Sequence, residues 1–247
     1  MSLLIVERLQ RSFGGVRAVD DVSFALDAGE VAALIGPNGA GKSTLFNLID
    51  GQLAPDGGSI LYDGQPLAAL STAARTRRGI GRTFQVAQAF ASMTALQNAQ
   101  LAVAAARGES QRFGAPLWTQ YREPAAALLR DVALGQRAER PAAELAYGDL
   151  KRLELALALA GRPRLLLMDE PTAGMAPGER TALMQLVVDL AREHGLSVLF
   201  TEHSMEVVFG FAQRVLVLAL GRLVADGLPD VVRADPEVQR VYLAEDS

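Results

Sequence analysis

The sequence contains no cysteine, and no apolar run in it approaches the length of a membrane-spanning helix. The first absence excludes disulfides and cysteine-ligated metal sites, and it suits a reducing compartment. The second predicts that the chain does not cross a bilayer itself, because a spanning helix takes about 20 apolar residues. Charge appears as early as Glu7 and Arg8, so no signal peptide is expected.

The chain also lacks the basic excess that nucleic-acid-binding proteins usually carry. Lys and Arg total 24 against 28 Asp and Glu, which gives a formal net charge of −4, so nucleic acid is not expected as the main partner. Hydrophobic residues make up 50% and charged residues 21% of the 247 residues, as in ordinary globular proteins. This length predicts one elaborated domain rather than several small ones.

Short apolar segments alternate with helical patterns along the chain. Strands are predicted at residues 3–9, 22–26, 31–35, 59–62, 165–168, 197–200, 215–218 and 222–225. Helices are predicted at 44–50, at 177–193 and from 235 onward. The segment from about 87 to 160 is dominated by Ala, Leu and Arg and is predicted to be mostly helical. This alternation predicts an α/β core with a mainly parallel sheet and a helical insertion.

The segment after the apolar run 31–35 fits the phosphate-binding pattern G-x-x-x-x-G-K-[ST]. It follows a strand of the buried type and begins a helix, which is the context that the pattern requires. Glycines let backbone N–H groups close around phosphate oxygens, and a helix N-terminus favours negative charge. Lys42 is expected to reach the β- and γ-phosphates, and the Ser43 hydroxyl to bind Mg²⁺. The residues expected to hold the nucleotide phosphates are Gly36, Pro37, Asn38, Gly39, Ala40, Gly41, Lys42, Ser43 and Thr44.

Two acidic residues follow the apolar run 165–168. Asp169, at such a strand end, can hold Mg²⁺ directly or through water. Glu170 is placed to polarise the attacking water as a general base. His203 follows the strand 197–200 at the carboxyl edge of the predicted sheet, where ligands bind in such folds, and can hydrogen-bond a γ-phosphate. Taken alone, a histidine there is more often a helix cap or a surface residue.

These motifs follow one another in an order that resembles the nucleotide-binding subunits of ABC transporters over nearly the whole chain. The order is the phosphate loop, Arg82-Thr83-Phe84-Gln85, Leu145-Ala146-Tyr147-Gly148-Asp149, Asp169-Glu170 and His203. The resemblance implies that Phe13 stacks on adenine. It also implies that Gln85 senses the γ-phosphate and Mg²⁺ and couples to a membrane partner. Residues 145–149 would form a signature loop, in which Tyr147 and Gly148 face the ATP of an opposite subunit, so that two subunits sandwich two ATP molecules.

A narrower resemblance is to the LivG-type ATPases of branched-chain amino-acid importers. It rests on the segments 13–19, 82–85, 147–148, 153–154, 173–175 and 238–243. The expected fold is an α/β P-loop (RecA-like) core with a mainly parallel sheet, an antiparallel β subdomain at the N-terminal side and an inserted α-helical subdomain. Within one domain over 1–247, the core with its β subdomain is expected at 1–86 and 159–227. The helical subdomain is expected at 87–158, and a C-terminal helical tail at 228–247.

The signature loop departs from the family's usual Leu-Ser-x-Gly-Gln. Ala146 replaces the serine whose hydroxyl would donate to the opposite γ-phosphate, a charge-assisted hydrogen bond worth about 1.5–3 kcal/mol. Asp149 adds an acidic group near triphosphate, which is unfavourable unless it points elsewhere. Ala176 stands where the family often has Asp or Asn and where a helix cap is expected, and alanine there costs about 1 kcal/mol.

These departures predict an asymmetric pair of sites if the dimer partner is a paralogue. The composite site that contains this chain's signature loop should be the weaker one, because it lacks a hydrogen bond to the γ-phosphate. Glu170→Gln in this chain should therefore lower turnover by a different factor from the matching change in the partner. Equal losses would count against the asymmetry.

The sequence therefore predicts the ATP-hydrolysing subunit of an ABC importer, with branched-chain or related amino acids as cargo. The residues expected to carry hydrolysis are Glu170, His203, Lys42 and Gln85, and those expected to bind Mg²⁺ are Ser43, Gln85 and Asp169. Expected partners are a second ATPase subunit, which is a copy or a paralogue, integral permease subunits and, indirectly, a substrate-binding protein. The expected location is peripheral, at the cytoplasmic face of the inner membrane.

Two alternatives stay open at this point. The first is a soluble ABC ATPase that acts on ribosomes or DNA. The chain has neither the second ATPase unit nor the long coiled-coil insertion that is common in that class, and its acidic balance also disfavours it. The second is a regulatory subunit that binds ATP and hydrolyses it weakly. Ala146 and Ala176 favour this alternative, and the intact hydrolytic set disfavours it.

Overall fold

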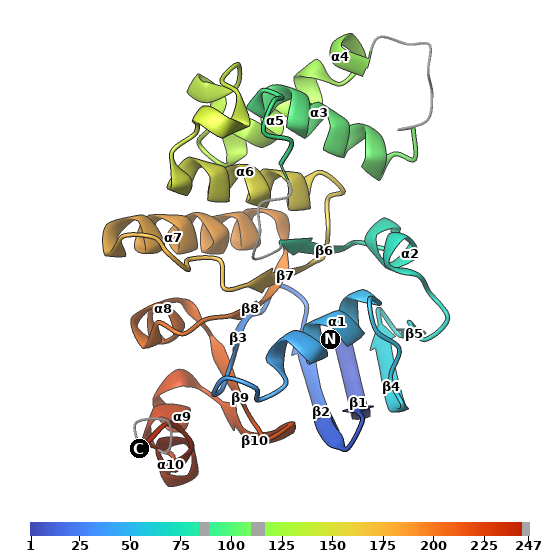
Figure 1. Cartoon of the computed structure of the whole chain (residues 1–247), viewed down its shortest axis with the longest axis vertical. Helices are drawn as coiled ribbons and strands as arrows, with labels where there is room; N and C mark the ends of the chain where they lie inside the picture. Colours follow the sequence, from blue (N-terminus) through green and yellow to red (C-terminus); the bar gives the residue numbers. More distant parts are fainter. Residues whose placement is uncertain (84–88, 110–116, 244–247) are drawn as a thin grey trace.

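The computed structural model describes residues 1–83, 89–109 and 117–243 (Figure 1). Two β-sheets lie on either side of helix α1 (Lys42–Asp50), and other helices cover the outer face of the larger sheet. Within the described ranges, no helix combines the length and apolarity that a bilayer crossing requires.

The larger sheet has six strands in the order β10-β9-β3-β8-β7-β6. Its strands are β3 (Val31–Ile35), β6 (Ile80–Thr83), β7 (Leu165–Asp169), β8 (Ser197–Thr201), β9 (Arg214–Ala219) and β10 (Arg222–Gly227). All neighbours pair in parallel except β10, which is antiparallel to β9. Both β3 and β8 are buried along their whole length, as expected of parallel strands covered on two faces. The prediction of a mainly parallel sheet is confirmed.

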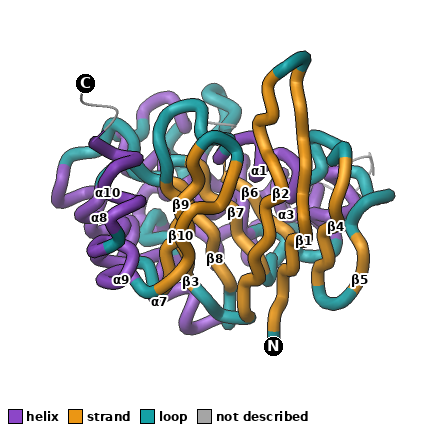
Figure 2. Tube along the Cα trace, turned by 90° about the horizontal axis from the view of Figure 1, so that it is seen from below, coloured by secondary structure: helices purple, strands orange, loops and turns teal. Residues whose placement is uncertain are grey.

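The smaller sheet is antiparallel, in the order β2-β1-β4-β5, and lies on the N-terminal side as predicted. Its strands are β1 (Ser2–Phe13), β2 (Val16–Asp27), β4 (Gly57–Tyr62) and β5 (Gln65–Pro66). The first two are longer than the alternation of apolar residues indicated. They form a hairpin whose tip projects from the body of the molecule (Figure 2).

In the segment between β5 and β7, helices lie both before and after β6. They are α2 (Thr72–Arg77), α3 (Ala95–Ala106), α4 (Leu117–Gln120), α5 (Arg122–Asp131) and α6 (Tyr147–Leu159), with 3₁₀ turns η1 (Gly135–Arg137) and η2 (Ala142–Glu144). The C-terminal half adds α7 (Pro177–His194), α8 (Met205–Phe211), α9 (Pro229–Ala234) and α10 (Pro236–Leu243). Gly195 ends α7 in a left-handed conformation, and before α10 the Asp235 carboxylate accepts from the backbone N–H of Glu237 at 2.7 Å.

Successive residues of β3 belong to two separate hydrophobic cores. Val31, Ala33 and Ile35 pack on the side of α3 and α5 to α8, whereas Ala32 and Leu34 pack on the side of α1 and the smaller sheet. The alternation follows from the two-residue period of a strand. Because α1 is buried between the sheets, the loop at its N-terminus is fixed at the carboxyl end of β3.

Each predicted strand lies within an observed one, but two strands were not predicted: the two-residue β5 and the longer β6. The sequence of β6, Ile80-Gly81-Arg82-Thr83, has one large apolar residue and an arginine, so it carries no clear strand pattern. Pairing with β7 makes it an edge strand of the larger sheet. The short helices α2, α8 and α9 were also missed.

Candidate nucleotide site

The phosphate loop joins β3 to α1 and turns on glycines whose conformations other residues avoid. Gly36, Gly39 and Gly41 have φ angles of +150°, +76° and +105°. A Cβ on Gly36 would lie 2.0 Å from the carbonyl oxygen of Leu218, and one on Gly41 would lie 2.1 Å from that of Ala18. Strands β2 and β9 therefore lie in close contact with the loop at Gly41 and Gly36, and only glycine fits at these two positions.

Lys42 is the first residue of α1, and its side chain is buried at the loop. Its Nζ donates to the carbonyl oxygens of Gly36 at 2.6 Å and Pro37 at 3.0 Å. The next residue, Ser43, is exposed. The loop therefore brings together an ammonium group, an exposed hydroxyl and the N-terminus of α1, which is a combination that binds phosphate.

Asp169 and Glu170, at the end of β7, are both held by Thr201 of β8. The Thr201 hydroxyl donates to Oδ1 of Asp169 at 2.8 Å and accepts from the backbone N–H of Glu170 at 3.0 Å. His203 Nε2 lies 3.0 Å from Oε1 of Glu170, so an ionised Glu170 requires the proton on Nε2. The φ of Glu170 is +48°, a left-handed conformation that costs energy and recurs at functional sites.

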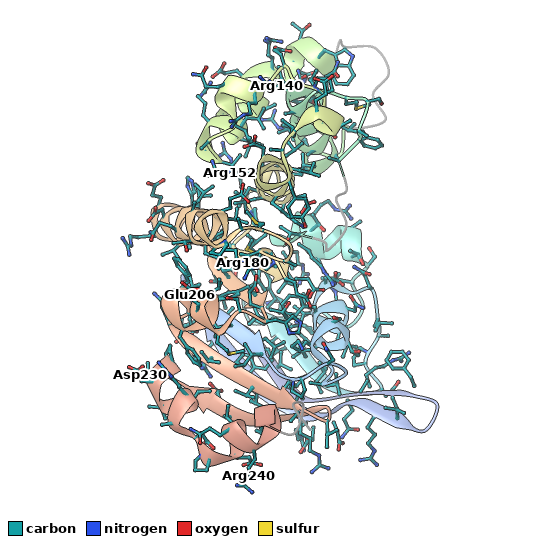
Figure 3. The ribbon with its side chains drawn as sticks, turned by 60° about the vertical axis from the view of Figure 1, so that its left-hand side comes forward. Arg140, Arg152, Arg180, Glu206, Asp230 and Arg240 are labelled. Atoms are coloured by element: carbon teal, nitrogen blue, oxygen red, sulfur yellow. The ribbon has the colours of Figure 1, made fainter. Side chains whose placement is uncertain are left out.

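A cavity of about 290 Å³ opens beside this pair. Its lining comprises Glu170, Thr172, Ala173, Arg180, Glu202, His203 and Ser204. Arg180, from the first turn of α7, lies near the middle of the molecule (Figure 3). The carboxylate and the imidazole therefore border one space that is large enough to admit water, as a general base for hydrolysis requires.

Arg82, on the edge strand β6, connects the phosphate-loop helix to Asp169. Its Nη1 donates to Oδ1 of Asn47 at 2.7 Å and makes a short ion pair with Oδ2 of Asp50, and its Nη2 lies 3.4 Å from Oδ2 of Asp169. Phe46 packs under the guanidinium, and the distance from Cζ of Arg82 to the centroid of the Phe46 ring is 5.7 Å. In the sequence, Arg82 stands out only as part of a family pattern and its role is not apparent, because its partners are distant in the chain.

A second cavity, of about 470 Å³, separates α2 and β6 from α3 and α6. Its wall on the helical side includes Leu157 but consists mainly of small residues: Ala102, Ala105, Ala106, Ala158, Ala160 and Gly161. Its opposite side includes Arg75, Arg77 and Arg82, and Glu154 of α6 also lines it. Burial raises the pKa of the Glu154 carboxyl, and the neighbouring Lys151 opposes this shift. We call this cavity the inter-helical groove.

The hairpin of β1 and β2 carries Phe13 near its tip, with 45% of the residue exposed. Arg11 lies over the ring, 4.9 Å from its centroid, and is itself held by Asp56 at 2.9 Å. The same hairpin contacts the phosphate loop at Ala18, opposite Gly41. Phe13, at the end of β1, is therefore presented to solvent on a hairpin whose other strand, β2, contacts the phosphate loop.

The signature loop lies beside the segment that follows Glu170. The hydroxyl of Tyr147 donates to the carbonyl oxygen of Ala173 at 2.9 Å. A Cβ on Gly148 would lie 3.2 Å from Oε1 of Glu179, so little room remains at that glycine. Asp149 forms an ion pair with Arg137 at 3.0 Å. The negative charge that the sequence placed in the signature loop is therefore paired within the chain.

Ala176 takes the N-cap position of α7, as predicted, and its side chain offers no hydrogen bond. The carboxylate of Glu179 accepts from the backbone N–H of Ala176 at 3.3 Å instead.

Among the predicted site residues, the structure brings together Lys42 and Ser43 on one loop, and Glu170 and His203 beside Asp169. Gln85 lies outside the described residues.

Comparison with known proteins identifies the family of the fold and of this site. Residues 19–173 match the family model described as ABC transporter, and residues 222–243 match that described as branched-chain amino acid ATP-binding cassette transporter. The chain is 39% identical to the high-affinity branched-chain amino acid transport ATP-binding protein BraF of Pseudomonas aeruginosa. It is 38% identical to LivG of Escherichia coli K12, which carries the same description. Both matches cover 98% of this chain and 98% of the relative.

Solved structures agree with these matches. A cassette of an ABC transporter in its ADP conformation is 32% identical to the chain, with a TM-score of 0.86 over 98% of this chain and 99% of that one. A dimeric bacterial ABC transporter cassette is 26% identical, with a TM-score of 0.78 over 92% of this chain and 98% of that one. The predicted α/β P-loop fold is confirmed.

Proposed function

Since this chain belongs to the family of ABC transporter ATP-binding proteins, we propose that it hydrolyses ATP to power an importer for branched-chain or related amino acids. The proposal that the chain hydrolyses ATP rests on the 3.0 Å contact between Glu170 and His203 beside Asp169. A subunit that only bound nucleotide would need the phosphate loop but not this pair. The contact therefore favours hydrolysis over a purely regulatory role.

In this proposal each residue of the site has a separate task. Glu170 accepts a proton from the attacking water, and His203 keeps the carboxylate oriented through Nε2. Lys42 and the N-terminus of α1 stabilise the charge that develops on the phosphates. Phe13 stacks on adenine, and Gln85 senses the γ-phosphate, as the family resemblance implies.

The oxygen donors of the site fit Mg²⁺, which prefers carboxylate, hydroxyl and phosphate oxygens. Ser43 supplies an exposed hydroxyl and Asp169 a carboxylate, and we propose Gln85 as a further member. The described residues contain no cluster of three or more His, Cys, Asp or Glu side chains that could hold a metal. The ion is therefore expected to need the phosphates of the nucleotide, whose charge it would neutralise.

The proposed partners are a second ATPase subunit and integral permease subunits. The solved dimer of a related cassette supports the first, and the transport names of BraF and LivG support the second. We place the signature loop, including Tyr147 and Gly148, against the nucleotide of the second subunit. We propose that a cytoplasmic permease segment enters the inter-helical groove, because its alanine-lined wall lets another backbone approach closely. On this view the helical subdomain at 87–158 moves as a unit when the dimer closes.

The cargo and the location follow from the relatives. BraF and LivG are described as branched-chain amino acid transport proteins, and the C-terminal match at 222–243 carries the same specificity in its name. We therefore propose branched-chain or related amino acids as cargo, delivered by a substrate-binding protein. The chain would sit at the cytoplasmic face of the inner membrane.

The test is ATP hydrolysis by the chain assembled with its permease in liposomes. The substrate-binding protein saturated with leucine is expected to raise hydrolysis several-fold over the unliganded protein. Lys42→Ala in this chain should abolish the increase, because the phosphates lose their ammonium partner. Hydrolysis that does not respond to leucine, isoleucine or valine would reject the proposed cargo. Absence of hydrolysis in every assembly would reject the ATPase itself.

A further inference from the structure

Arg82 lies between two carboxylates from different parts of the fold. Asp50, at the end of α1, makes the short ion pair with Nη1, while Asp169, at the end of β7, lies 3.4 Å from Nη2. All three side chains are at least nine-tenths buried: 9% of Arg82, 5% of Asp50 and 10% of Asp169 is exposed. The guanidinium therefore pairs more closely with the carboxylate that has no part in the proposed mechanism.

Asp50 occupies an unusual position for a buried acid. It is the last residue of α1, where the helix dipole disfavours negative charge. Gln52 fixes its two oxygens, through the backbone N–H at 2.9 Å and through Nε2 at 2.8 Å. Arg75 lies close by and donates to the carbonyl oxygens of Leu48 and Ile49 at 2.7 and 2.8 Å. The carboxylate is therefore held in one orientation, facing Arg82.

Asp169 has one oxygen committed within the fold and one oriented toward Arg82. Its Oδ1 accepts from Thr201, and its Oδ2 has the long contact with Arg82. A guanidinium that moved fully onto Oδ2 would compete with a metal ion for that oxygen. The strong pairing with Asp50 opposes such a move.

We infer that Asp50 is a positioning residue that holds the Arg82 guanidinium away from Asp169 and so keeps Oδ2 of Asp169 accessible to Mg²⁺. This inference rests on the proposed role of Asp169 in the nucleotide site. The charges support it. Asp50, Arg82 and Asp169 together carry a net charge of −1, which attracts a cation, whereas loss of the Asp50 charge leaves the group neutral beside the site.

The test measures the Mg²⁺ requirement of nucleotide binding, in a Glu170→Gln background that limits hydrolysis. The probe is a fluorescent ATP analogue, titrated with Mg²⁺ and also measured in EDTA. Asp50→Asn is expected to raise the Mg²⁺ concentration at half-maximal binding about tenfold, the lower end of the loss in metal affinity that follows when a residue supporting a metal ligand is removed. Binding in EDTA should not change, because the phosphate loop is untouched.

A double variant distinguishes this role from a merely structural one. Asp50→Asn with Arg82→Gln removes the competing guanidinium as well, so the Mg²⁺ requirement should return to within about threefold of the parent, a smaller change than the roughly tenfold or greater loss expected when only a residue that supports a metal ligand is removed. Arg77→Gln is the matched control: Arg77 lines the same groove, is exposed and makes no ion pair with Asp169 in the described structure. Its Mg²⁺ requirement should equal that of the parent.

Either of two results would overturn the inference: an unchanged Mg²⁺ requirement in Asp50→Asn, or a double variant that is as impaired as the single one. If thermal melting shows that Asp50→Asn does not fold, the double variant alone is the test. A tenfold rise in its Mg²⁺ requirement then rejects the inference. A parent that binds nucleotide equally well with and without Mg²⁺ would instead reject the proposed role of Asp169. The two failures are therefore distinguishable.

Discussion

Replacement of Glu170 by glutamine is expected to lower ATP turnover by about 10²–10⁴-fold, the range over which general-base catalysis contributes to rate. The substitution keeps the size of the side chain and removes its basicity, so the attacking water loses its proton acceptor. ATP binding should be retained, because Lys42 and the phosphate loop are unchanged. The contact with His203 at 3.0 Å should also survive, since a neutral amide oxygen still accepts from Nε2.

The measurement is steady-state phosphate release together with equilibrium ATP binding. Glu206→Gln is the matched control, because Glu206 is an exposed carboxylate in the first turn of α8, outside the cavity beside Glu170. It should leave both quantities unchanged. A turnover loss of less than tenfold in Glu170→Gln would mean that another group accepts the proton, and His203 would then become the first candidate.

Gly41→Ala is expected to lower the free energy of unfolding by at least about 3 kcal/mol, among the larger effects of single substitutions. Two causes add. The backbone has φ +105°, where an L-residue is strained, and the new Cβ would lie 2.1 Å from the carbonyl oxygen of Ala18. That oxygen belongs to the hairpin strand β2, so relief requires movement of the sheet or of α1. ATP binding should be lost with it, because the phosphate loop must shift.

Gly39→Ala separates the clash from the strain. Gly39 has φ +76°, but nothing lies within 4 Å of the position that its Cβ would take. Its expected cost is therefore about 1–2 kcal/mol, the strain of a left-handed residue alone. Urea denaturation measures the free energy of unfolding of each of the two variants. Equal losses of stability would show that β2 does not constrain the loop at Gly41.

The residues that the sequence placed correctly belong to continuous segments. Gly36 to Thr44, Asp169 and Glu170 each adjoin a buried strand, so the strand pattern fixes their place at the carboxyl edge of the sheet. The place of His203 after the strand 197–200 indicates a contact with the γ-phosphate, and the order of the motifs favours this interpretation over a helix cap or a surface residue. The structure then places His203 in contact with Glu170.

The residues that sequence analysis missed depend on pairs distant in the chain. Arg82 meets Asp50 and Asp169 only because β6 joins the sheet beside β7, and that strand has no apolar pattern to announce it. The partner of Asp149 is a similar case: Arg137 lies in a 3₁₀ turn between helices, and no local rule relates the two. Local patterns therefore predicted where the phosphate loop and the acidic strand end lie, but not how the surrounding charges are paired.

The alanine-lined wall of the inter-helical groove gives the molecule a practical property. Ala105 is exposed on that wall, and the chain contains no cysteine. Ala105→Cys would therefore create the only thiol in the protein, at the surface that we assign to the permease. A spectroscopic label attached there reports from one known point, with no background from other sites and no need to remove native residues first.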